Sequence, residues 1–306
     1  RMAGLRPAGV LIEILSRHKH LEPVRVDPRT DGVPSDVAAL MLATPTEVSL
    51  DLVPRALEKG IKVVDLSGAF RLRRPDNYTR WYGLEHRFPE LLEEAAYGLP
   101  EFCRGRIRGA RLVANPGCYP TAANLALKPL LDAGVVDRAA GVVCDAKSGV
   151  SGAGRKPTQK THFSEVAENF SAYSVLDHRH VPEVLLTSGL EEDEFSFTAQ
   201  LLPVHRGILE TIYFRASRPL DRGEIEAIYR QRYAGEPFLR IYGDGKQPDL
   251  HAVAHTNYCD IGIRADAPSR RVVIVATIDN LVKGAAGQAV QNLNLMLGLE
   301  ETEGLL

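Results

Sequence analysis

Short apolar segments alternate with helical segments through the amino-terminal part of this sequence. Residues 23–26 are typical of a short strand, and apolar runs typical of buried strands lie at residues 38–43, 62–66 and 111–114. Apolar residues recur at helical spacing in residues 9–18, 47–60 and 121–131. Pro54 should kink or divide the second of these helices. Strands and helices in alternation predict a doubly wound parallel sheet.

The pattern changes after Gly141. Longer segments with alternating apolar and polar residues follow, at 195–202, 211–215 and 271–278. They predict a mixed or antiparallel sheet in a second domain. The last helical segment, residues 285–297, has an apolar face and is expected to return to the first domain. The predicted fold class is therefore α/β, with a Rossmann-type doubly wound parallel sheet and a second α+β domain.

Charge and cysteine content exclude several classes of protein. The chain has 306 residues, with 37 Lys and Arg against 39 Asp and Glu, so its net charge of −2 offers no basic surface to nucleic acid or to a membrane. Its 4 cysteines lie far apart without a Cys-x-x-Cys pair, so neither a disulfide framework nor a metal site is expected. No apolar run approaches the roughly 18 residues that span a bilayer, and no secretory signal is present. We expect a cytoplasmic protein that acts on a small molecule.

Cys118 has the sequence setting of a reactive thiol. It follows the turn residues Asn115-Pro116-Gly117 and precedes a helix, where unpaired backbone N–H groups and the positive helix end favour a thiolate. A thiolate here would be a nucleophile at neutral pH, whereas a buried structural cysteine is the alternative that spacing leaves open. The other cysteines lack this setting and are expected to be structural: Cys103, Cys144 and Cys259.

Seven blocks of sequence form a recognisable set. The longest is VANPGCYPTA at residues 113–122, which continues at 126–129. The others are DLSGAFRL at 65–72, YGLPE at 97–101, SGVSGAGR at 148–155, HRHVPE at 178–183, RGIL at 206–209 and DNLVKGAAG at 279–287. Together they resemble the N-acetyl-gamma-glutamyl-phosphate reductase family from Gly9 onward. The resemblance implies NADPH-dependent reduction of an acyl phosphate to N-acetyl-glutamate semialdehyde, with phosphate release, in arginine biosynthesis.

The implied reaction agrees with the chemistry of a cysteine nucleophile. A thiolate displaces the phosphate of an acyl phosphate to give a thioester on Cys118, and a thioester accepts hydride well. Backbone N–H groups at the start of the following helix are the nearest donors for the oxyanion. We expect residues 1–117 with 286–306 to form the dinucleotide-binding domain and residues 118–285 to form the catalytic and dimerisation domain. The expected cofactor is NADP(H), and the expected assembly is a homo-oligomer, a dimer or a tetramer.

The proton donor and acceptor is sought among histidines, because only histidine titrates near neutral pH without a large perturbation. His178 and His180 lie with Glu183 in a block that matches the family, whereas His205 is expected to be a polar loop residue. In a helix only one of the pair reaches the sulfur, but in an extended segment both share a face. We favour His180, because Glu183 can orient its ring if the stretch is helical, and we keep His178 as the alternative.

Anion-binding and cofactor-binding residues complete the predicted site. Arg206 and Arg155 have the fork geometry that holds a phosphate or carboxylate, with a solvated arginine as the alternative for Arg206. Asn115 is the third predicted substrate-binding residue. The predicted cofactor-binding residues are Gly9, Thr44, Ser67, Ser148, Gly149 and Asn280. The resemblance implies that the last three lie near the nicotinamide, and a plain turn asparagine is the alternative for Asn280.

The amino-terminal end departs from the family pattern. Related chains open with a strand and a Gly-x-x-Gly-x-x-Gly turn, but this sequence keeps only Gly9, with Ala3 and Arg6 at the other glycine positions. The link between residues 26 and 36 is also short for the family. We interpret both joins as omissions, because a doubly wound sheet without its first strand has an unpaired centre. Arg29 is the candidate ligand of the 2′-phosphate.

Other functions fit part of the pattern. The nearest are related reductases of aspartyl or aminoadipyl phosphates, although Tyr119-Pro120-Thr121 and the histidine block favour the N-acetylglutamyl substrate. A cysteine hydrolase would use the same Cys and His without a nicotinamide, and the Ser148-Gly149 and Asp279-Asn280 blocks argue against it. An inactive dinucleotide-binding protein is supported only by the broken glycine pattern.

Overall fold

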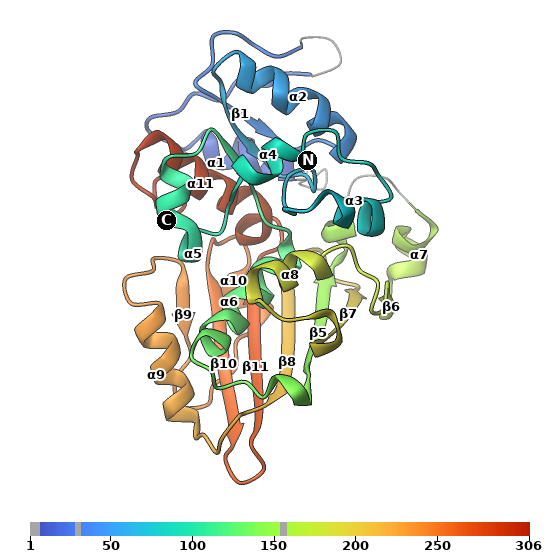
Figure 1. Ribbon diagram of the computed structural model, residues 1–306, viewed down its shortest axis with the longest axis vertical. Helices are drawn as coiled ribbons and strands as arrows, with labels where there is room; N and C mark the ends of the chain where they lie inside the picture. The colour runs from blue at the N-terminus through green and yellow to red at the C-terminus, as the bar shows by residue number, and fades with distance from the viewer. Residues whose placement is uncertain (1–6, 28–31, 154–157) are drawn as a thin grey trace. The chain divides into compact units, whose positions relative to one another are not determined.

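The structure is a computed structural model that describes residues 7–27, 32–153 and 158–306 (Figure 1). The chain divides into two compact units, Arg1–Gly117 with Ala285–Leu306 and Cys118–Gly284. The predicted boundary between residues 285 and 286 therefore lies one residue from the division in the structure. Arg29, Arg155 and the expected glycine positions 3 and 6 lie outside the described residues.

The first unit contains a four-stranded parallel sheet in the order β1-β2-β4-β3. Its strands are β1 (Ala39–Leu42), β2 (Lys62–Asp65), β3 (Ala96–Tyr97) and β4 (Leu112–Ala114). Val63 and Val64 in β2, with Leu112 and Val113 in β4, are fully buried, because both faces of a parallel sheet are covered. The predicted doubly wound parallel sheet is confirmed.

Six helices of the described chain belong to this first unit. They are α1 (Pro7–Leu15), α2 (Thr46–Glu58), α3 (Pro75–Tyr82), α4 (Pro89–Glu94), α5 (Pro100–Arg108) and α11 (Gly287–Leu297). Helix α2 runs through Pro54, so this proline does not divide the helix. Helix α11 comes from the far end of the chain and receives a hydrogen bond from Lys62 Nζ at the Met296 carbonyl. The side chain of Asn292 on the same helix donates to the Gly98 carbonyl.

The strand predicted at residues 23–26 is wrong. This segment has no regular secondary structure, and the Val24 side chain is 72% exposed. Pro23 has no N–H group to donate to a ladder, and an exposed segment of this length gains little from pairing. Among the described residues, β1 pairs only with β2.

The second unit is built on a seven-stranded mixed sheet in the order β6-β7-β5-β8-β11-β10-β9. Its strands are β5 (Val142–Gly149), β6 (Ser171–Tyr173), β7 (Phe195–Leu202), β8 (Ile208–Arg215), β9 (Leu239–Ile241), β10 (Cys259–Asp266) and β11 (Arg271–Ile278). The pairs β5–β7 and β9–β10 are parallel and the other pairs are antiparallel. The mixed sheet predicted for the second domain is confirmed.

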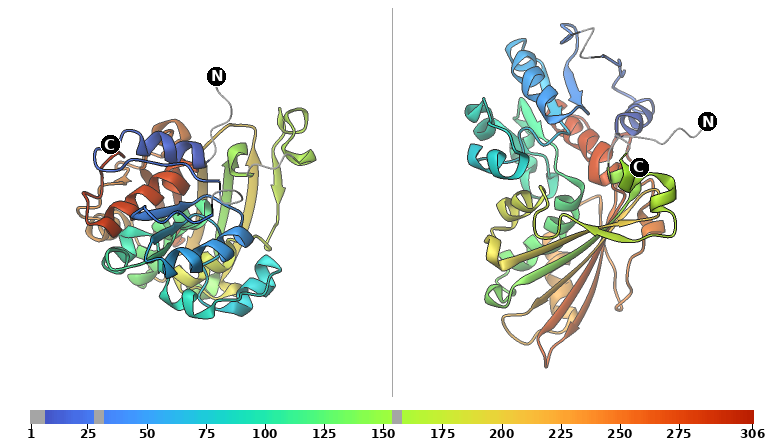
Figure 2. Two further views of the ribbon diagram at one scale, coloured as in Figure 1. Left: turned by 90° about the horizontal axis from the view of Figure 1, so that it is seen from above. Right: turned by 90° about the vertical axis from the view of Figure 1, so that its right-hand side faces the viewer.

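One face of this sheet carries helices (Figures 1 and 2). The helices of the unit are α6 (Cys118–Asp132), α7 (Phe163–Val166), α8 (Val181–Ser188), α9 (Arg222–Arg232) and α10 (Leu250–Val253), and a π-helix, η5 (Val282–Ala286), follows β11. The side chains of Tyr229 and Tyr233 donate to the α6 carbonyls of Ala126 and Leu125, which joins α9 to α6. Helix α6 therefore forms the centre of the layer that covers this face.

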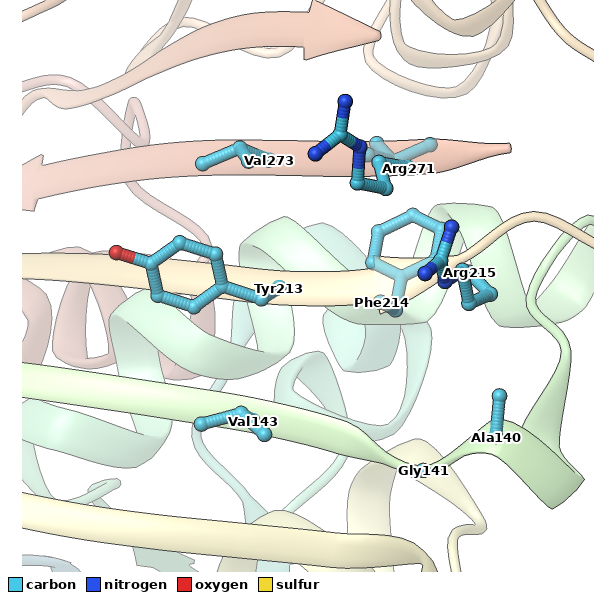
Figure 3. A pocket seen from close by; sticks show the side chains of 9 residues that line it. Ala140, Gly141, Val143, Tyr213, Phe214, Arg215, Arg271 and Val273 are labelled. Atoms are coloured by element: carbon cyan, nitrogen blue, oxygen red, sulfur yellow. The ribbon is translucent and has the colours of Figure 1, made fainter. Parts of the chain in front are cut away.

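The opposite face of the sheet bears a row of partly exposed side chains (Figure 3). Val143, Tyr213 and Val273 are register partners on β5, β8 and β11. Val143 and Tyr213 are 44% and 43% exposed, although both have large apolar surfaces. None of the described helices has the length and apolar character needed to cross a membrane.

Candidate active site

Cys118 is the first residue of α6 and is a half-buried free cysteine. The helix begins three residues earlier than predicted, because Pro120 falls in the first turn, where the missing N–H would have no partner within the helix. The thiol therefore occupies the helix start, where the backbone N–H groups lack carbonyl partners. This is the setting that the sequence predicted for a nucleophile.

The π-helix η5 lies directly against Cys118. A Cβ atom placed on Gly284 would be 2.8 Å from the Cys118 Cβ and 3.3 Å from its Cα, so only glycine fits at this point. The backbone N–H groups of Leu281 and Val282 donate to Asp279 Oδ1 at 2.8 and 3.2 Å. Asp279 therefore holds the start of the segment that contacts Cys118.

The rings of His178 and His180 lie beside Tyr119, the residue that follows Cys118. The Tyr119 ring makes edge contacts with the rings of His178 and His180, with centroid distances of 5.4 and 6.0 Å. The two imidazoles are 4.8 Å apart, and Phe197 packs against both His178 and Tyr119. Both imidazoles thus share one buried aromatic cluster with Tyr119.

The geometry differs from both sequence expectations for this histidine pair. The Val181 N–H donates to the His178 carbonyl at 2.8 Å, which closes a turn over residues 178–181, and α8 begins at Val181 with His180 as its N-cap residue. The His180 backbone N–H donates to His178 Nδ1 at 3.1 Å, which bends the segment so that both rings converge. Glu183 lies in the first turn of α8 and is fully buried.

The surroundings of His178 shift its pKa. Burial, with a smaller contribution from the Arg179 charge, lowers the pKa of His178 from 6.5 to about 4. His178 is therefore neutral at pH 7, and because its Nδ1 accepts a hydrogen bond, its proton is on Nε2. A neutral imidazole of low pKa is a poor proton donor at neutral pH, so His180 remains the candidate for this role.

Tyr119 and Tyr173 form a second polar feature of the cluster. Their hydroxyl oxygens are 3.0 Å apart, and the Tyr119 hydroxyl also donates to the Gln200 carbonyl at 3.4 Å. Burial, followed by the effect of Tyr173, raises the pKa of Tyr119 far above its usual value. Both phenols therefore remain protonated at neutral pH. The sequence analysis did not assign either tyrosine to the site.

Arg206 forms a buried ion pair with Asp279. Its Nη1 atom donates to Asp279 Oδ2 at 2.9 Å, and the two side chains are 9% and 0% exposed. The Nε and Nη2 atoms of Arg206 donate to no other described residue. Arg206, the predicted anion-binding residue, is thus held through Nη1, and its Nε and Nη2 donors are not used by the described residues. Asp279 appeared in a family block, but its role was not predicted.

The residues predicted to lie near the nicotinamide form a compact group within the second unit. Asn280 accepts a hydrogen bond from the Gly207 N–H at 2.7 Å and donates from Nδ2 to Ser151 Oγ at 3.0 Å. A Cβ atom on Gly149 would be 2.8 Å from the Arg206 backbone nitrogen, so glycine allows β5 to approach the 204–206 loop. The buried Ser148 lies in the same strand, next to Gly149. The Nδ2 atom of Asn280 has a second hydrogen, for which no acceptor is found among the described residues.

Two of the predicted cofactor residues of the first unit lie at the carboxyl ends of parallel strands. Thr44 follows β1 and Ser67 follows β2, and a chain of hydrogen bonds runs from Thr44 through Ser49 and Asp65 to Ser67. Burial raises the pKa of Asp65, and the hydrogen bonds from Ser67 and Ser49 oppose that effect. Dinucleotides bind at this edge of doubly wound sheets. The structure therefore brings Thr44 and Ser67 together at a suitable edge.

Asn115 and Gly9 occupy structural positions in the first unit. The Asn115 side chain accepts from Asn292 Nδ2 at 2.9 Å and donates to the Ala285 carbonyl at 3.2 Å, and it is fully buried. It therefore joins the loop after β4 to the carboxyl-terminal part of the unit. Gly9 lies inside α1 and not at a turn before it.

Two family models match the chain. Residues 6–110 match the family described as "Semialdehyde dehydrogenase, NAD binding domain", and residues 118–280 match "Semialdehyde dehydrogenase, dimerisation domain". The aspartate semialdehyde dehydrogenase II of Vibrio cholerae has a similar structure, with a TM-score of 0.69 and 18% identity over 97% of this chain and 96% of that chain. A probable aspartate-semialdehyde dehydrogenase of Pseudomonas aeruginosa gives a TM-score of 0.63 and 23% identity over 86% of this chain and 80% of that chain. The fold and the domain matches define the class: a two-domain oxidoreductase of the semialdehyde dehydrogenase type.

Sequence relatives narrow this class. Proteins of Symbiobacterium thermophilum and Halorhodospira halophila are both 52% identical, over 86% and 87% of this chain and 76% and 78% of their own lengths. A protein of Methanopyrus kandleri is 42% identical over 97% of this chain and 94% of its own length. All three are named N-acetyl-gamma-glutamyl-phosphate reductase. The chain belongs to the N-acetyl-gamma-glutamyl-phosphate reductase family, which confirms the resemblance of its motifs, and its NAD-binding domain supports a nicotinamide cofactor.

Proposed function

We propose that this chain reduces N-acetyl-gamma-glutamyl phosphate to N-acetyl-glutamate 5-semialdehyde with NADPH, through a thioester on Cys118, as a step of arginine biosynthesis. The observation that carries the proposal is the setting of Cys118 at the start of α6, beside the cluster of Tyr119, His178 and His180. The names of relatives at 42–52% identity supply the substrate. Four free cysteines suit a reducing cytoplasm, which keeps the thiol available.

The chain's own groups account for the acyl-transfer step. The Cys118 sulfur attacks the acyl carbon, the C–S bond forms, and the bond to the phosphate oxygen breaks with release of inorganic phosphate. Backbone N–H groups in the first turn of α6 donate to the oxyanion of the tetrahedral stage. Gly284 allows the π-helix to lie against the Cβ and Cα atoms of Cys118 without a clash.

His180 is proposed as the group that moves the proton. Reduction of the thioester leaves an oxygen that must gain a proton, and the reverse reaction must remove it. His178 is neutral with a pKa of about 4, so at pH 7 it orients its neighbours and does not donate this proton. Glu183, buried in the first turn of α8, is proposed to act on His180 as a positioning residue.

Arg206 and Asn115 are proposed to bind the substrate together with Arg155. The Nε and Nη2 atoms of Arg206 form the edge that binds a carboxylate or phosphate through two hydrogen bonds. The Asp279 carboxylate fixes the opposite side of the guanidinium. Asn115 offers one amide hydrogen, because its other polar positions are used by Ala285 and Asn292.

The proposed cofactor is NADP(H), which supplies a hydride to the thioester carbon when it is bound. In the first unit, Thr44 and Ser67 fit a dinucleotide, since they lie at the carboxyl ends of β1 and β2 with their hydroxyls ordered by Ser49 and Asp65. Gly9 in α1 is proposed for the same group. In the second unit, Ser148, Gly149 and the spare Asn280 hydrogen are proposed for the carboxamide end. Comparison of kcat/KM for NADP(H) and NAD(H) tests the choice, and a clear preference for NAD(H) would contradict it.

A second copy of the chain is the proposed partner, in a dimer or a tetramer. The row of Val143, Tyr213 and Val273 leaves an apolar strip on the open sheet face, and a shallow groove extends from it to Arg215 and Arg271. The match to a dimerisation domain over residues 118–280 supports this assignment. Tyr213→Asp should lower the mass measured by light scattering, whereas Val24→Asp, on an exposed residue outside this face, should not.

The activity is tested by phosphate-dependent reduction of NADP with N-acetyl-glutamate semialdehyde, followed by absorbance. Wild-type protein should show turnover, and Cys118→Ser should lose it, because a hydroxyl of similar size is a much weaker nucleophile. Cys103→Ser is the matched control, since that cysteine lies in α5 and outside the proposed site. Activity of more than a few per cent in Cys118→Ser would remove the thioester from the proposal.

A further inference from the structure

His255 has a left-handed backbone conformation that side chains rarely adopt. Its φ is 64°, in the turn between α10 and β10. Residues other than glycine keep such a conformation only where their surroundings hold them, and these positions cluster at functional sites. The contacts of His255 therefore require an explanation.

Two hydrogen bonds hold His255 to the Arg206–Asp279 ion pair. Its backbone N–H donates to Asp279 Oδ2 at 2.7 Å, and its ring Nδ1 lies 3.1 Å from Arg206 Nη1. Because arginine has donors and no acceptor, Nδ1 accepts this bond and carries no hydrogen. The neutral ring therefore carries its hydrogen on Nε2.

The contact decides which edge of the guanidinium is available. Arg206 Nη1 has two hydrogens, and the acceptors Asp279 Oδ2 and His255 Nδ1 take one each. The Nε and Nη2 atoms then form the edge that remains, and no described residue accepts from it. That edge presents two parallel donors, which match the two oxygens of a carboxylate or a phosphate.

We propose that His255 is a positioning residue that orients the Nε/Nη2 edge of Arg206 toward a substrate oxyanion. The proposal rests on the function proposed above. Asp279 alone holds one hydrogen of Nη1 and leaves the guanidinium free to turn. The His255 ring supplies the second fixed point, so the bidentate edge is ordered before the substrate arrives, and less freedom is lost on binding.

The substitution His255→Gly isolates the role of the ring. Glycine adopts a φ of 64° without strain, and it keeps the backbone N–H that binds Asp279. KM for one oxyanion-bearing substrate should rise about tenfold, the effect of one hydrogen bond to a charged group, with kcat within about twofold. Asp244→Gly is the matched control, because Asp244 is exposed, has a φ of 55° and does not contact Arg206.

Kinetics in the aldehyde-oxidising direction distinguish whether Arg206 binds the substrate carboxylate or the phosphate. N-acetyl-glutamate semialdehyde and inorganic phosphate are then varied independently. A higher KM for the aldehyde in His255→Gly identifies the substrate carboxylate, and a higher KM for phosphate identifies the transferred phosphate. Unchanged KM values for both, or equal effects in Asp244→Gly, would overturn the proposal.

A measurement that does not depend on enzyme activity tests the role of His255 independently of the proposed function. Nitrogen-15 NMR of wild-type protein with labelled histidine should show that the ring hydrogen of His255 is on Nε2. The signal is assigned by its absence from the spectrum of His255→Gly. A hydrogen on Nδ1 would overturn the Arg206 contact. Inactive wild-type protein would instead overturn the proposed function and leave this test in place.

Discussion

Gly284 and Cys118 are in such close contact that a single methyl group could not be inserted between them. A Cβ atom on Gly284 would be 2.8 Å from the Cys118 Cβ. The π-helix η5 therefore supports the proposed nucleophile directly, and one-turn π-helices often occur at functional sites.

The substitution Gly284→Ala should displace Cys118 or η5 and reduce kcat more than tenfold. The added methyl group should also lower the free energy of unfolding by about 1–3 kcal/mol, because close-packed interiors do not absorb extra volume. Alkylation of Cys118 by iodoacetamide should change in rate. Gly105→Ala is the control, since Gly105 lies in α5 with no atom within 4 Å of its added Cβ. Equal kinetics in both variants would contradict a supporting role for Gly284.

His180→Asn should lower kcat by about 10²–10⁴-fold, with little change in NADPH binding. His178→Asn should have a smaller effect, because His178 is neutral at pH 7 with a pKa of about 4. Steady-state kinetics of both variants at saturating NADPH measure the difference. A larger kcat loss in His178→Asn would reverse the assignment.

Stability should fall as the pH is lowered through the range in which His178 is protonated only in the unfolded chain. The folded pKa of about 4 lies below the reference value of 6.5, so the unfolded state binds more protons between these values. The contribution of His178 is intact above pH 6.5 and decreases by about 2 kcal/mol between pH 7 and pH 5. His178→Gln should lose this part of the pH dependence in urea unfolding. An identical dependence in wild type and variant would show that His178 is not buried as described.

Glu210 should have the opposite effect on stability. It is fully buried in β8, where Cys144 Sγ donates to its Oε2 at 3.6 Å, and burial raises its pKa well above the usual value. Because Glu210 keeps its proton in the folded protein and loses it in the unfolded chain, the free energy of unfolding falls as the pH rises above the unfolded pKa. The decrease is at most about 1.4 kcal/mol for each pH unit. Glu210→Gln, which cannot ionise, should be the more stable protein at pH 7 and above. Parallel unfolding curves from pH 5 to pH 8 for both proteins would contradict this prediction.

The sequence by itself determined the class of fold and the position of Cys118, the proposed nucleophile, at a helix start. Apolar runs in alternation with helices dictate a parallel sheet, because both features depend on periodicity within one segment. Cys118 was identifiable because a turn and a helix start are local in sequence. The prediction of a strand at residues 23–26 was wrong, because apolar composition alone does not provide a neighbouring strand for pairing.

Only the tertiary structure decided how the site is assembled. The convergence of His178 and His180 depends on a turn that neither a helical nor an extended periodicity describes. The contact of Arg206 with Asp279 joins residues 73 positions apart, and that of His255 with Asp279 joins residues 24 apart. Such contacts arise from the pairing of β8 with β11 and from the packing of their loops, and local sequence patterns do not encode them. The helix-start setting of Cys118 was thus a local property, whereas the contacts of Arg206, the proposed anion-binding residue, were fixed by long-range packing.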